Sequence, residues 1–355
     1  MSFEYHFIRS SSIDMLNLIS AIFSRYCQII LFVFGGLGLI LNTIIFTRKI
    51  FRQNSCVHYF LASTIANYFV VFFILPSRIL SDGFYVDPGR YSLFYCKIRF
   101  YTYFTAKSLA SWFIVLACFD RRMSSSQQVQ RRAFARLTVS RWMIALTTIL
   151  GLLFYSHVLI YYEIDNDQRC DARAGAYRLF NDIVYLIGYS LAPPLFMFIF
   201  GIWTIGNTRR LHRIVPRFGR RLAVLNHRDH TLMLMLFLQV ILITITAVPH
   251  AVQKLYSTLT IDVPKDEFRK AADKVFIIIV RTISFFNHSC TFYILTLSGR
   301  MFRKELGKIL RKILCQTQRQ RRRQSRRLGA NLPLRQVTQT FNPSPNEQPL
   351  SKRNE

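Results

Sequence analysis

The sequence CQIILFVFGGLGLILNTIIFT, residues 27–47, contains no charged side chain. A helix needs roughly 20 consecutive apolar residues to cross the hydrocarbon core of a bilayer, and this stretch is long enough. Its apolar residues lie on every side of a helix rather than along one stripe, which is typical of a helix surrounded by lipid. Backbone polar groups inside a bilayer must pair within their own segment. The stretch therefore predicts a membrane-spanning helix.

Six further windows of the same kind follow along the chain. Of the 355 residues, 51% are hydrophobic and only 18% are charged, which is apolar for a soluble protein of this size. The windows at about 97–119 and 274–297 each contain an internal charge, Lys107 and Arg281. The pattern predicts an all-α membrane protein with a bundle of seven transmembrane helices, the remaining windows being 57–80, 140–162, 181–205 and 231–254.

The net charge of +29 is segregated along the chain: the segments that follow the first, third and fifth windows, and the C-terminal segment 299–355, are rich in Lys and Arg. Short loops rich in Lys and Arg stay in the cytoplasm, so this distribution predicts an extracellular N-terminus and a cytoplasmic C-terminus. Because the charge follows the topology of a membrane protein, it does not indicate a nucleic-acid partner. Glu4 and Asp14 interrupt the N-terminal segment, so we expect no cleavable signal peptide.

The segments that flank the bundle differ from it in composition. We expect an extracellular tail at 1–26, the bundle at 27–298, an amphipathic interfacial helix at 299–315 and a disordered basic cytoplasmic tail at 316–355. The arginines of this last segment are expected to meet anionic lipid heads. Cys315 ends the amphipathic segment, where it is a candidate for lipidation; the alternative is an unmodified thiol.

Three of the seven cysteines fall on the predicted extracellular side, where disulfides form stably. Cys96 lies at the outer end of the third window and Cys170 in the loop before the fifth, while Cys27 begins the first. A disulfide between Cys96 and Cys170 would hold that loop over the mouth of the bundle. The alternatives are free thiols or a pairing with Cys27.

The inner end of the third window reads Asp120-Arg121-Arg122, and Arg121 follows Cys96 by 25 residues. This combination resembles the rhodopsin-like (class A) G-protein-coupled receptors, whose third span opens with the disulfide cysteine and closes with Asp-Arg-Tyr at that separation. The resemblance covers nearly all of residues 27–315. Further positions that match the family in order and spacing are Asn42, Pro76, Trp142, Pro193-Pro194, Pro249 and Phe302-Arg303.

Within that family the chain resembles the invertebrate FMRFamide-type and somatostatin-like peptide receptors and their orphan relatives. The resemblance implies a receptor in the plasma membrane that binds an extracellular ligand, a peptide in that group, and activates a heterotrimeric G protein. It implies no enzymatic activity, cofactor or metal, and no P-loop, metal-ligand cluster or pairing of nucleophile and base stands out in the sequence.

Several family positions carry other residues in this chain. Arg122 replaces the tyrosine of the Asp-Arg-Tyr motif, and Asn67 stands where the family usually has Asp, which puts an inner sodium site in doubt. The usual tryptophan two residues before Pro249 is missing, and residues 291–295 lack the proline of the family's seventh span. Weak, constitutive or unusual coupling is therefore an open possibility.

Asp229 precedes Pro249 by 20 residues, near the inner end of the sixth window. At about 1.5 Å per residue, this separation of roughly 30 Å brings Asp229 to the membrane depth of Arg121. We expect Asp120 and Asp229 to hold Arg121 in the resting state, and the sixth span to move away from it on activation. The alternative is that Arg121 only obeys the positive-inside bias.

Two ligand classes are excluded by residues that the chain lacks. The position that carries a carboxylate in amine receptors is Tyr103, and the position of the opsin lysine is Phe285. The windows contain cations instead, and ionisable groups inside a membrane are usually functional. The candidate ligand-binding residues are Tyr103, Lys107, His250, Gln253, Lys254 and Arg281, and Arg78 is a further intramembrane cation.

We expect the ligand to offer these cations an acidic or hydrogen-bond-accepting group, as a short peptide would, with a small anionic lipid or carboxylic acid as the next choice. In the alternative interpretation, Lys107 is neutral and bonded to Tyr or Ser neighbours, and Arg281 pairs with Asp182 or water. Arg78 and Lys254 could also extend to the outer headgroups. An anion channel or transporter is the competing functional class.

Overall fold

We describe the protein from a computed structural model. The structure describes residues 2–165, 168–214, 220–261, 263–298 and 302–309, with the single positions 311, 315, 316, 318 and 320. Nearly all of the predicted cytoplasmic tail at 316–355, and with it the expectation of disorder, lies outside these residues.

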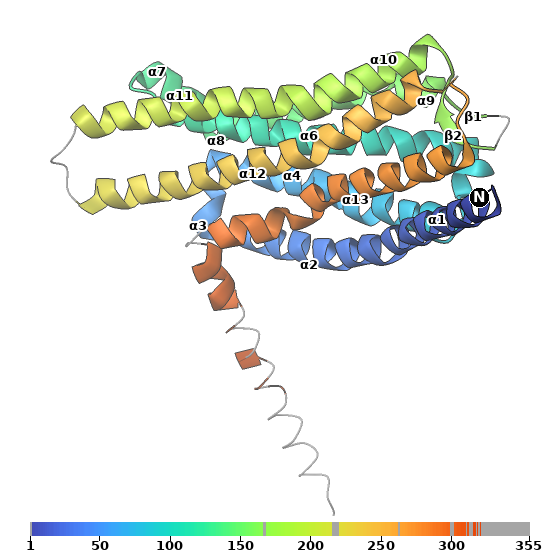
Figure 1. Ribbon diagram of the computed structural model, residues 1–355. Coiled ribbons are helices and arrows are strands. Elements are labelled where there is room, and N and C mark those ends of the chain that lie inside the picture. Colours follow the sequence, from blue (N-terminus) through green and yellow to red (C-terminus); the bar gives the residue numbers. More distant parts are fainter. Residues whose placement is uncertain are drawn as a thin grey trace, which may run out of the picture. The chain divides into compact units, whose positions relative to one another are not determined.

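Seven helices in the described part of the chain are long and apolar enough to cross a membrane, which confirms the predicted all-α bundle. Figure 1 shows them side by side, with their connections at the two ends. Each predicted window overlaps one of the candidate spans, which are Ser11–Phe46, Ser55–Gly83, Leu93–Ser124, Leu137–Tyr161, Ala176–Asn207, Leu234–Leu259 and Glu267–Ile294.

The first two spans alternate regular α-helix with wider π-helical turns, and the third is the uninterrupted helix α6. In chain order the elements are α1 (Ser2–Ile22), the π-turn Phe23–Cys27, α2 (Gln28–Phe46), α3 (Lys49–Arg52), α4 (Ser55–Phe69), the π-turn Val70–Ile74, α5 (Leu75–Arg78), the π-turn Ile79–Gly83, the 3-10 turn Pro88–Arg90 and α6 (Leu93–Ser124).

The second half of the bundle contains the only strands among the described residues. Its elements are α7 (Val129–Arg132), the 3-10 turn Ala133–Ala135, α8 (Leu137–Phe154), α9 (His157–Tyr161), β1 (Tyr162–Ile164), β2 (Cys170–Ala172), α10 (Ala176–Tyr185), the π-turn Leu186–Leu191, α11 (Ala192–Ile214), α12 (Arg220–Leu259) and α13 (Glu267–Ser298). The strands β1 and β2 pair antiparallel as a short hairpin.

The N-terminal segment, expected as a tail, is helical from Ser2 and continues through a π-turn into α2. Helix α1 packs against α13. Polar side chains at the junction are buried: Ser24 and Gln28 are fully enclosed, and Gln28 Nε2 donates a hydrogen bond to Thr282 Oγ1 at 3.3 Å. The first span therefore extends further toward the N-terminus than its apolar window indicates.

Helix α6 lies at the centre of the bundle. It packs against α4, α8, α11 and α12, and its apolar window has the largest buried share of the seven spans, whereas α8 has the smallest. The exposed side chains of α8 are large and apolar, as expected of a surface in contact with lipid: Trp142, Leu146, Ile149, Leu150 and Leu153.

Two glycines of α2 allow a close approach to α13. A Cβ added to Gly35 would lie 2.7 Å from the Cβ of Ser289, and one added to Gly38 would lie 3.1 Å from the Cβ of Phe292. The first distance is shorter than two carbon atoms can adopt without displacement. Small residues at such a contact let membrane helices pack backbone to backbone, as the sequence indicates for this run.

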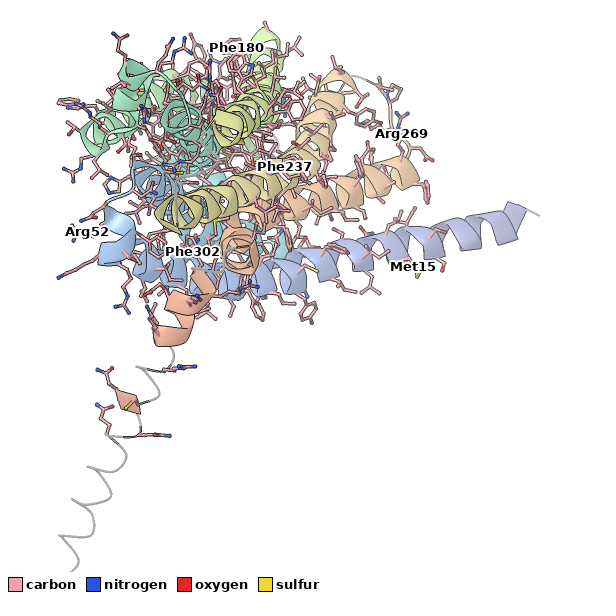
Figure 2. The ribbon with its side chains drawn as sticks, turned by 90° about the vertical axis from the view of Figure 1, so that its left-hand side faces the viewer. Met15, Arg52, Phe180, Phe237, Arg269 and Phe302 are labelled. Atoms are coloured by element: carbon pink, nitrogen blue, oxygen red, sulfur yellow. A yellow bond between two sulfur atoms is a disulfide. The ribbon has the colours of Figure 1, made fainter. Side chains whose placement is uncertain are left out.

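The two ends of the bundle are named here after residues at the two ends of α6. The end with Cys96 is called the disulfide end, and the end with Asp120 and Arg121 is called the Arg121 end. At the Arg121 end the ring of Phe302 lies 5.6 Å from that of Phe46 and 4.9 Å from that of Phe51 in α3 (Figure 2). Residues 302–309 are helical, and Cys315 is exposed.

Candidate functional site

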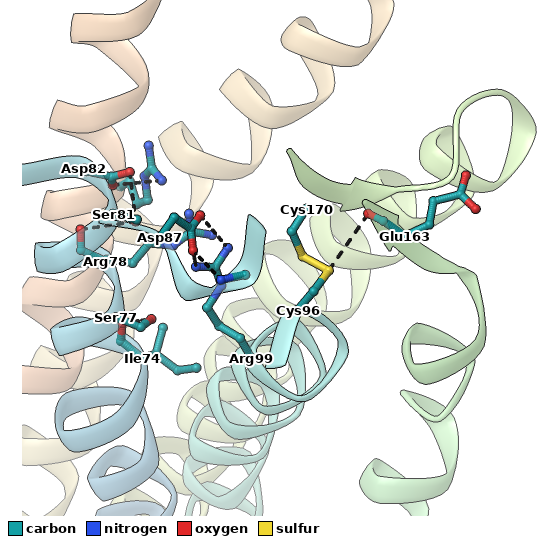
Figure 3. Close-up of polar contacts among 12 residues, drawn as sticks. Ile74, Ser77, Arg78, Ser81, Asp82, Asp87, Cys96, Arg99, Glu163 and Cys170 are labelled. Carbon is teal, nitrogen blue, oxygen red and sulfur yellow. Dashed lines mark hydrogen bonds and ion pairs between the residues drawn. A yellow bond between two sulfur atoms is a disulfide. The ribbon is translucent and has the colours of Figure 1, made fainter. Parts of the chain in front are cut away.

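A disulfide joins Cys96 to Cys170 at the first turn of α6, with a Cα–Cα distance of 5.7 Å (Figure 3). Cys170 begins β2, so the bond ties the hairpin to α6, and the ring of Tyr162 in β1 stacks on Phe100 at 4.6 Å. The pairing is the one expected first from the sequence. Cys27, the alternative partner, is a free thiol.

Replacing Cys170 by serine is expected to lower the free energy of unfolding by about 2–4 kcal/mol, because the hairpin loses its covalent tie and the unfolded chain gains freedom. Thermal unfolding of the purified full chain and its surface expression measure this loss. Cys27→Ser is the matched control, because it removes a free thiol. Equal behaviour of the two variants would show that the disulfide does not stabilise the fold.

Lys107, in the middle of α6, is fully buried among hydroxyl groups and rings. Its Nζ donates to Ser284 Oγ at 2.9 Å and lies 3.4 Å from the hydroxyl of Tyr103 and 3.5 Å from that of Tyr185. The rings of Tyr103, Tyr189 and Phe285 surround Nζ with centroids at 4.7, 5.3 and 4.9 Å. These contacts stabilise an ammonium group only in part.

Residues of α10 and α12 extend the cluster around Lys107. The hydroxyl of Tyr185 in α10 forms a hydrogen bond of 3.1 Å with Nδ1 of His250 in α12. The structure thus brings Tyr103, Lys107 and His250 of the predicted ligand-binding set together. Gln253 is buried but donates to Ser257 Oγ at 2.8 Å on its own helix, away from this cluster.

Arg281 has a carboxylate partner from the second span that no sequence pattern indicated. Its Nη1 lies 3.1 Å from Oδ2 of Asp82, an ion pair between α13 and the π-turn Ile79–Gly83 (Figure 3). Asp182, the partner expected for Arg281, pairs with Lys254 instead and accepts a hydrogen bond from Thr258. Lys254 therefore bridges α12 to α10 rather than extending freely to the headgroups.

A third ion pair lies near the disulfide end of the bundle. Arg99 Nη1 lies 2.6 Å from Oδ1 of Asp87, which also accepts the backbone N–H of Gly89 at 2.9 Å (Figure 3). Burial acts to raise the pKa of Asp87, but the hydrogen bond and charge of Arg99 together with the Gly89 N–H outweigh it, so the pKa is lowered. Asp87 is thus held as a carboxylate beside Arg99.

A second set of buried polar groups centres on His288. His288 of α13 places Nδ1 2.7 Å from Oδ1 of Asn67 and Nε2 3.0 Å from the hydroxyl of Tyr189. An amide oxygen only accepts, so in a neutral ring Nδ1 carries the hydrogen and Nε2 accepts from Tyr189. His288 therefore occupies the polar centre next to Asn67, where the family resemblance leaves a sodium site in doubt.

His288 is a site residue that no sequence pattern indicated. The available signal was a histidine within the apolar window 274–297. Its two partners come from α4 and the π-turn Leu186–Leu191, and no local spacing relates these segments to α13.

At the Arg121 end, the guanidinium of Arg121 donates to Oδ2 of Asp120 at 2.7 Å and to Oδ1 of Asn54 at 3.0 Å. Asn54 also caps α4, since it accepts from the Cys56 N–H at 3.0 Å. Arg122 points elsewhere, with its guanidinium carbon 3.7 Å from the ring centroid of Trp203 in α11. Arg122 thus packs on the fifth span.

Two predicted switch residues belong to α12. Pro249 lies inside this helix. Asp229 is on the same helix, but its side chain lies outside the described residues, so its expected contact with Arg121 stays a prediction.

The fold defines a multi-span helical membrane protein. No known protein family matches the chain, and no curated protein is significantly similar to it. Any narrower function depends on the arrangement of residues described above.

Proposed function

We propose that the protein is a rhodopsin-like G-protein-coupled receptor. One observation carries the proposal: a single central helix, α6, bears the disulfide Cys96–Cys170 at one end and the buried pair Asp120–Arg121 at the other, with the polar cluster around Lys107 between them. This arrangement offers a ligand site and a coupling site on one rigid element. Neither end requires a cofactor.

The orientation follows from charge and oxidation state. Disulfides form in oxidising compartments, so the disulfide end faces outward in the plasma membrane. The basic segments at the Arg121 end then face the cytoplasm, in accord with the positive-inside bias. The G protein approaches beside Arg121, and an extracellular ligand enters at the disulfide end.

The ligand carries an acidic or strongly hydrogen-bond-accepting group, as a short peptide does. Among the described residues no carboxylate contacts Lys107, whose described contacts are hydroxyl groups and aromatic rings. A cation held this way gains from an approaching acceptor. The anion-channel alternative receives no specific support from the contacts of the described residues.

Nucleotide exchange on purified G proteins tests the proposal without a known ligand. The full-length receptor in lipid nanodiscs is mixed with a panel of heterotrimeric G proteins, and Asp120→Asn is compared with wild type. The substitution removes the charge that holds Arg121, so we expect faster exchange on at least one G protein. Empty nanodiscs give the background rate.

Chloride flux into proteoliposomes that contain the same protein is the parallel measurement. Receptor function predicts no flux above empty vesicles. Flux without any receptor-dependent nucleotide exchange would replace the receptor proposal by the channel alternative.

A further inference from the structure

Arg78 lies in the most irregular part of the second span. It ends α5, a four-residue helix that starts with Leu75-Pro76 and lies between two π-turns, Val70–Ile74 and Ile79–Gly83. π-helical turns are rare, and they occur frequently at functional sites because they reorient side chains. Here the guanidinium carbon of Arg78 lies 5.2 Å from the ring centroid of Phe100 on α6. The side chain therefore extends between the second and third spans.

Two arginines near Arg78, Arg281 and Arg99, each have a carboxylate partner, and Arg78 does not. Arg281 pairs with Asp82 at 3.1 Å, and Arg99 pairs with Asp87 at 2.6 Å. Among the described residues no carboxylate lies within ion-pair distance of Arg78. Its Nε is buried without a hydrogen-bond partner in the same part of the chain.

Arg78 lies among charges of both signs. Its charge acts on the cations Lys107 and Arg281 and also on the carboxylate of Asp87. The carboxylates Asp82 and Asp87 flank Arg78 but are engaged by Arg281 and Arg99 (Figure 3). A partly buried charge without a partner costs free energy, and an anion from outside the chain would offset that cost.

The geometry of a guanidinium selects the anion. Its planar fork matches the two oxygens of a carboxylate, which it binds through two parallel hydrogen bonds. The guanidinium of Arg78 lies over the ring of Phe100, a contact that uses its planar face and not its hydrogen-bond donors. We propose that Arg78 binds a carboxylate of the extracellular ligand, either the C-terminus of a peptide or the acid group of a small molecule. This inference rests on the proposed receptor function.

Binding of two small probes to the purified full-length receptor tests the inference. N-acetylphenylalanine presents a carboxylate, and N-acetylphenylalaninamide is the same molecule with a neutral amide in its place. Saturation-transfer NMR and the thermal unfolding midpoint measure binding to wild type, Arg78→Gln, Arg78→Lys and the control Arg90→Gln, which changes an exposed loop arginine.

We expect wild type to bind the carboxylate probe at least about tenfold more tightly than the amide, the factor that corresponds to one charge-assisted hydrogen bond. Arg78→Gln should remove this preference and leave amide binding unchanged, and Arg90→Gln should retain it. Arg78→Lys should retain part of it, because a lysine keeps the charge but loses the fork. 3-Phenylpropionate, a carboxylic acid without a peptide bond, separates the two sources of the carboxylate. If wild type binds it more tightly than Arg78→Gln does, Arg78 accepts the carboxylate of any small acid. If only N-acetylphenylalanine shows this difference, Arg78 recognises a peptide C-terminus.

Two outcomes overturn the inference: no preference for the carboxylate in wild type, or an unchanged preference in Arg78→Gln and Arg78→Lys. If Arg78→Gln unfolds without a probe, Arg78→Lys and Phe100→Leu decide the question. Because no G protein takes part in these measurements, loss of the preference with intact nucleotide exchange rejects only this inference. Intact preference without any nucleotide exchange rejects the receptor proposal.

Discussion

Arg121→Gln is expected to abolish nucleotide exchange on the G protein, while Arg122→Gln leaves it close to wild type. The two arginines are adjacent in sequence but differ in contacts. Arg121 donates to Asp120 at 2.7 Å and to Asn54 at 3.0 Å, whereas Arg122 lies over Trp203 at 3.7 Å. In the proposed mechanism only Arg121 changes partners, when the sixth span moves away and the C-terminal helix of the G protein enters.

The Arg121 variant needs a control for stability, because it leaves the buried carboxylate of Asp120 without this cation. Removing one member of a buried pair costs about 3–5 kcal/mol. The double variant Asp120→Asn with Arg121→Gln removes both charges and should restore stability without restoring exchange. Surface expression and unfolding midpoints are measured beside the exchange rate for each protein.

Asp229→Ala extends the same experiment to α12. If Asp229 is the second partner of Arg121, the substitution raises basal exchange, since it removes one of the two carboxylates that hold the guanidinium. If Arg121→Gln and Asp229→Ala both exchange nucleotide at the wild-type rate, Arg121 has no role in coupling and only follows the positive-inside bias.

The seven spans could be predicted because each is a local property of the chain. A window such as 27–47 shows its apolar character without reference to any other segment, and lipid around the bundle imposes the same requirement on all seven. The disulfide could be predicted from topology, since few cysteines lie on one side. The hairpin β1–β2, held by that disulfide, has strands of three residues each and gave no periodic signal.

The ion pairs could not be predicted, because they depend on helix phase. Each residue turns an α-helix by about 100°, and a π-turn adds a residue to one turn, so the faces beyond Val70–Ile74 are rotated from those expected for a regular helix. Asp82 lies just beyond the predicted window 57–80, yet it pairs with Arg281. The contact of His288 with Asn67 joins residues 221 positions apart, which no local spacing shows.

Lys107→Met is expected to stabilise the protein, and Lys107→Ala to destabilise it. Lysine and methionine have similar lengths, so methionine fills the space between the rings of Tyr103 and Phe285 and removes a fully buried cation. Replacing a buried ion pair by apolar groups of similar volume is often neutral or stabilises proteins by about 1–4 kcal/mol, and Lys107 lacks even the attraction of a carboxylate partner. Alanine removes the charge as well but leaves a cavity, and large-to-small changes in a core cost about 2–5 kcal/mol.

The hydroxyl groups around Lys107 decide whether Lys107→Met raises or lowers the stability of the protein. Each has a second partner: Tyr103 and Tyr185 lie 3.4 Å apart, Tyr185 reaches His250 at 3.1 Å, and Ser284 donates to the carbonyl of Arg281 at 2.8 Å. Removing the ammonium group therefore leaves no buried hydroxyl unsatisfied, and the penalty for a lost partner does not arise. Unfolding midpoints of the two variants in nanodiscs measure the difference. A methionine variant less stable than wild type would mean that the hydrogen bonds and ring contacts of Lys107 outweigh the cost of burying its charge, and Lys107 would then be a structural residue rather than a cation available to a ligand.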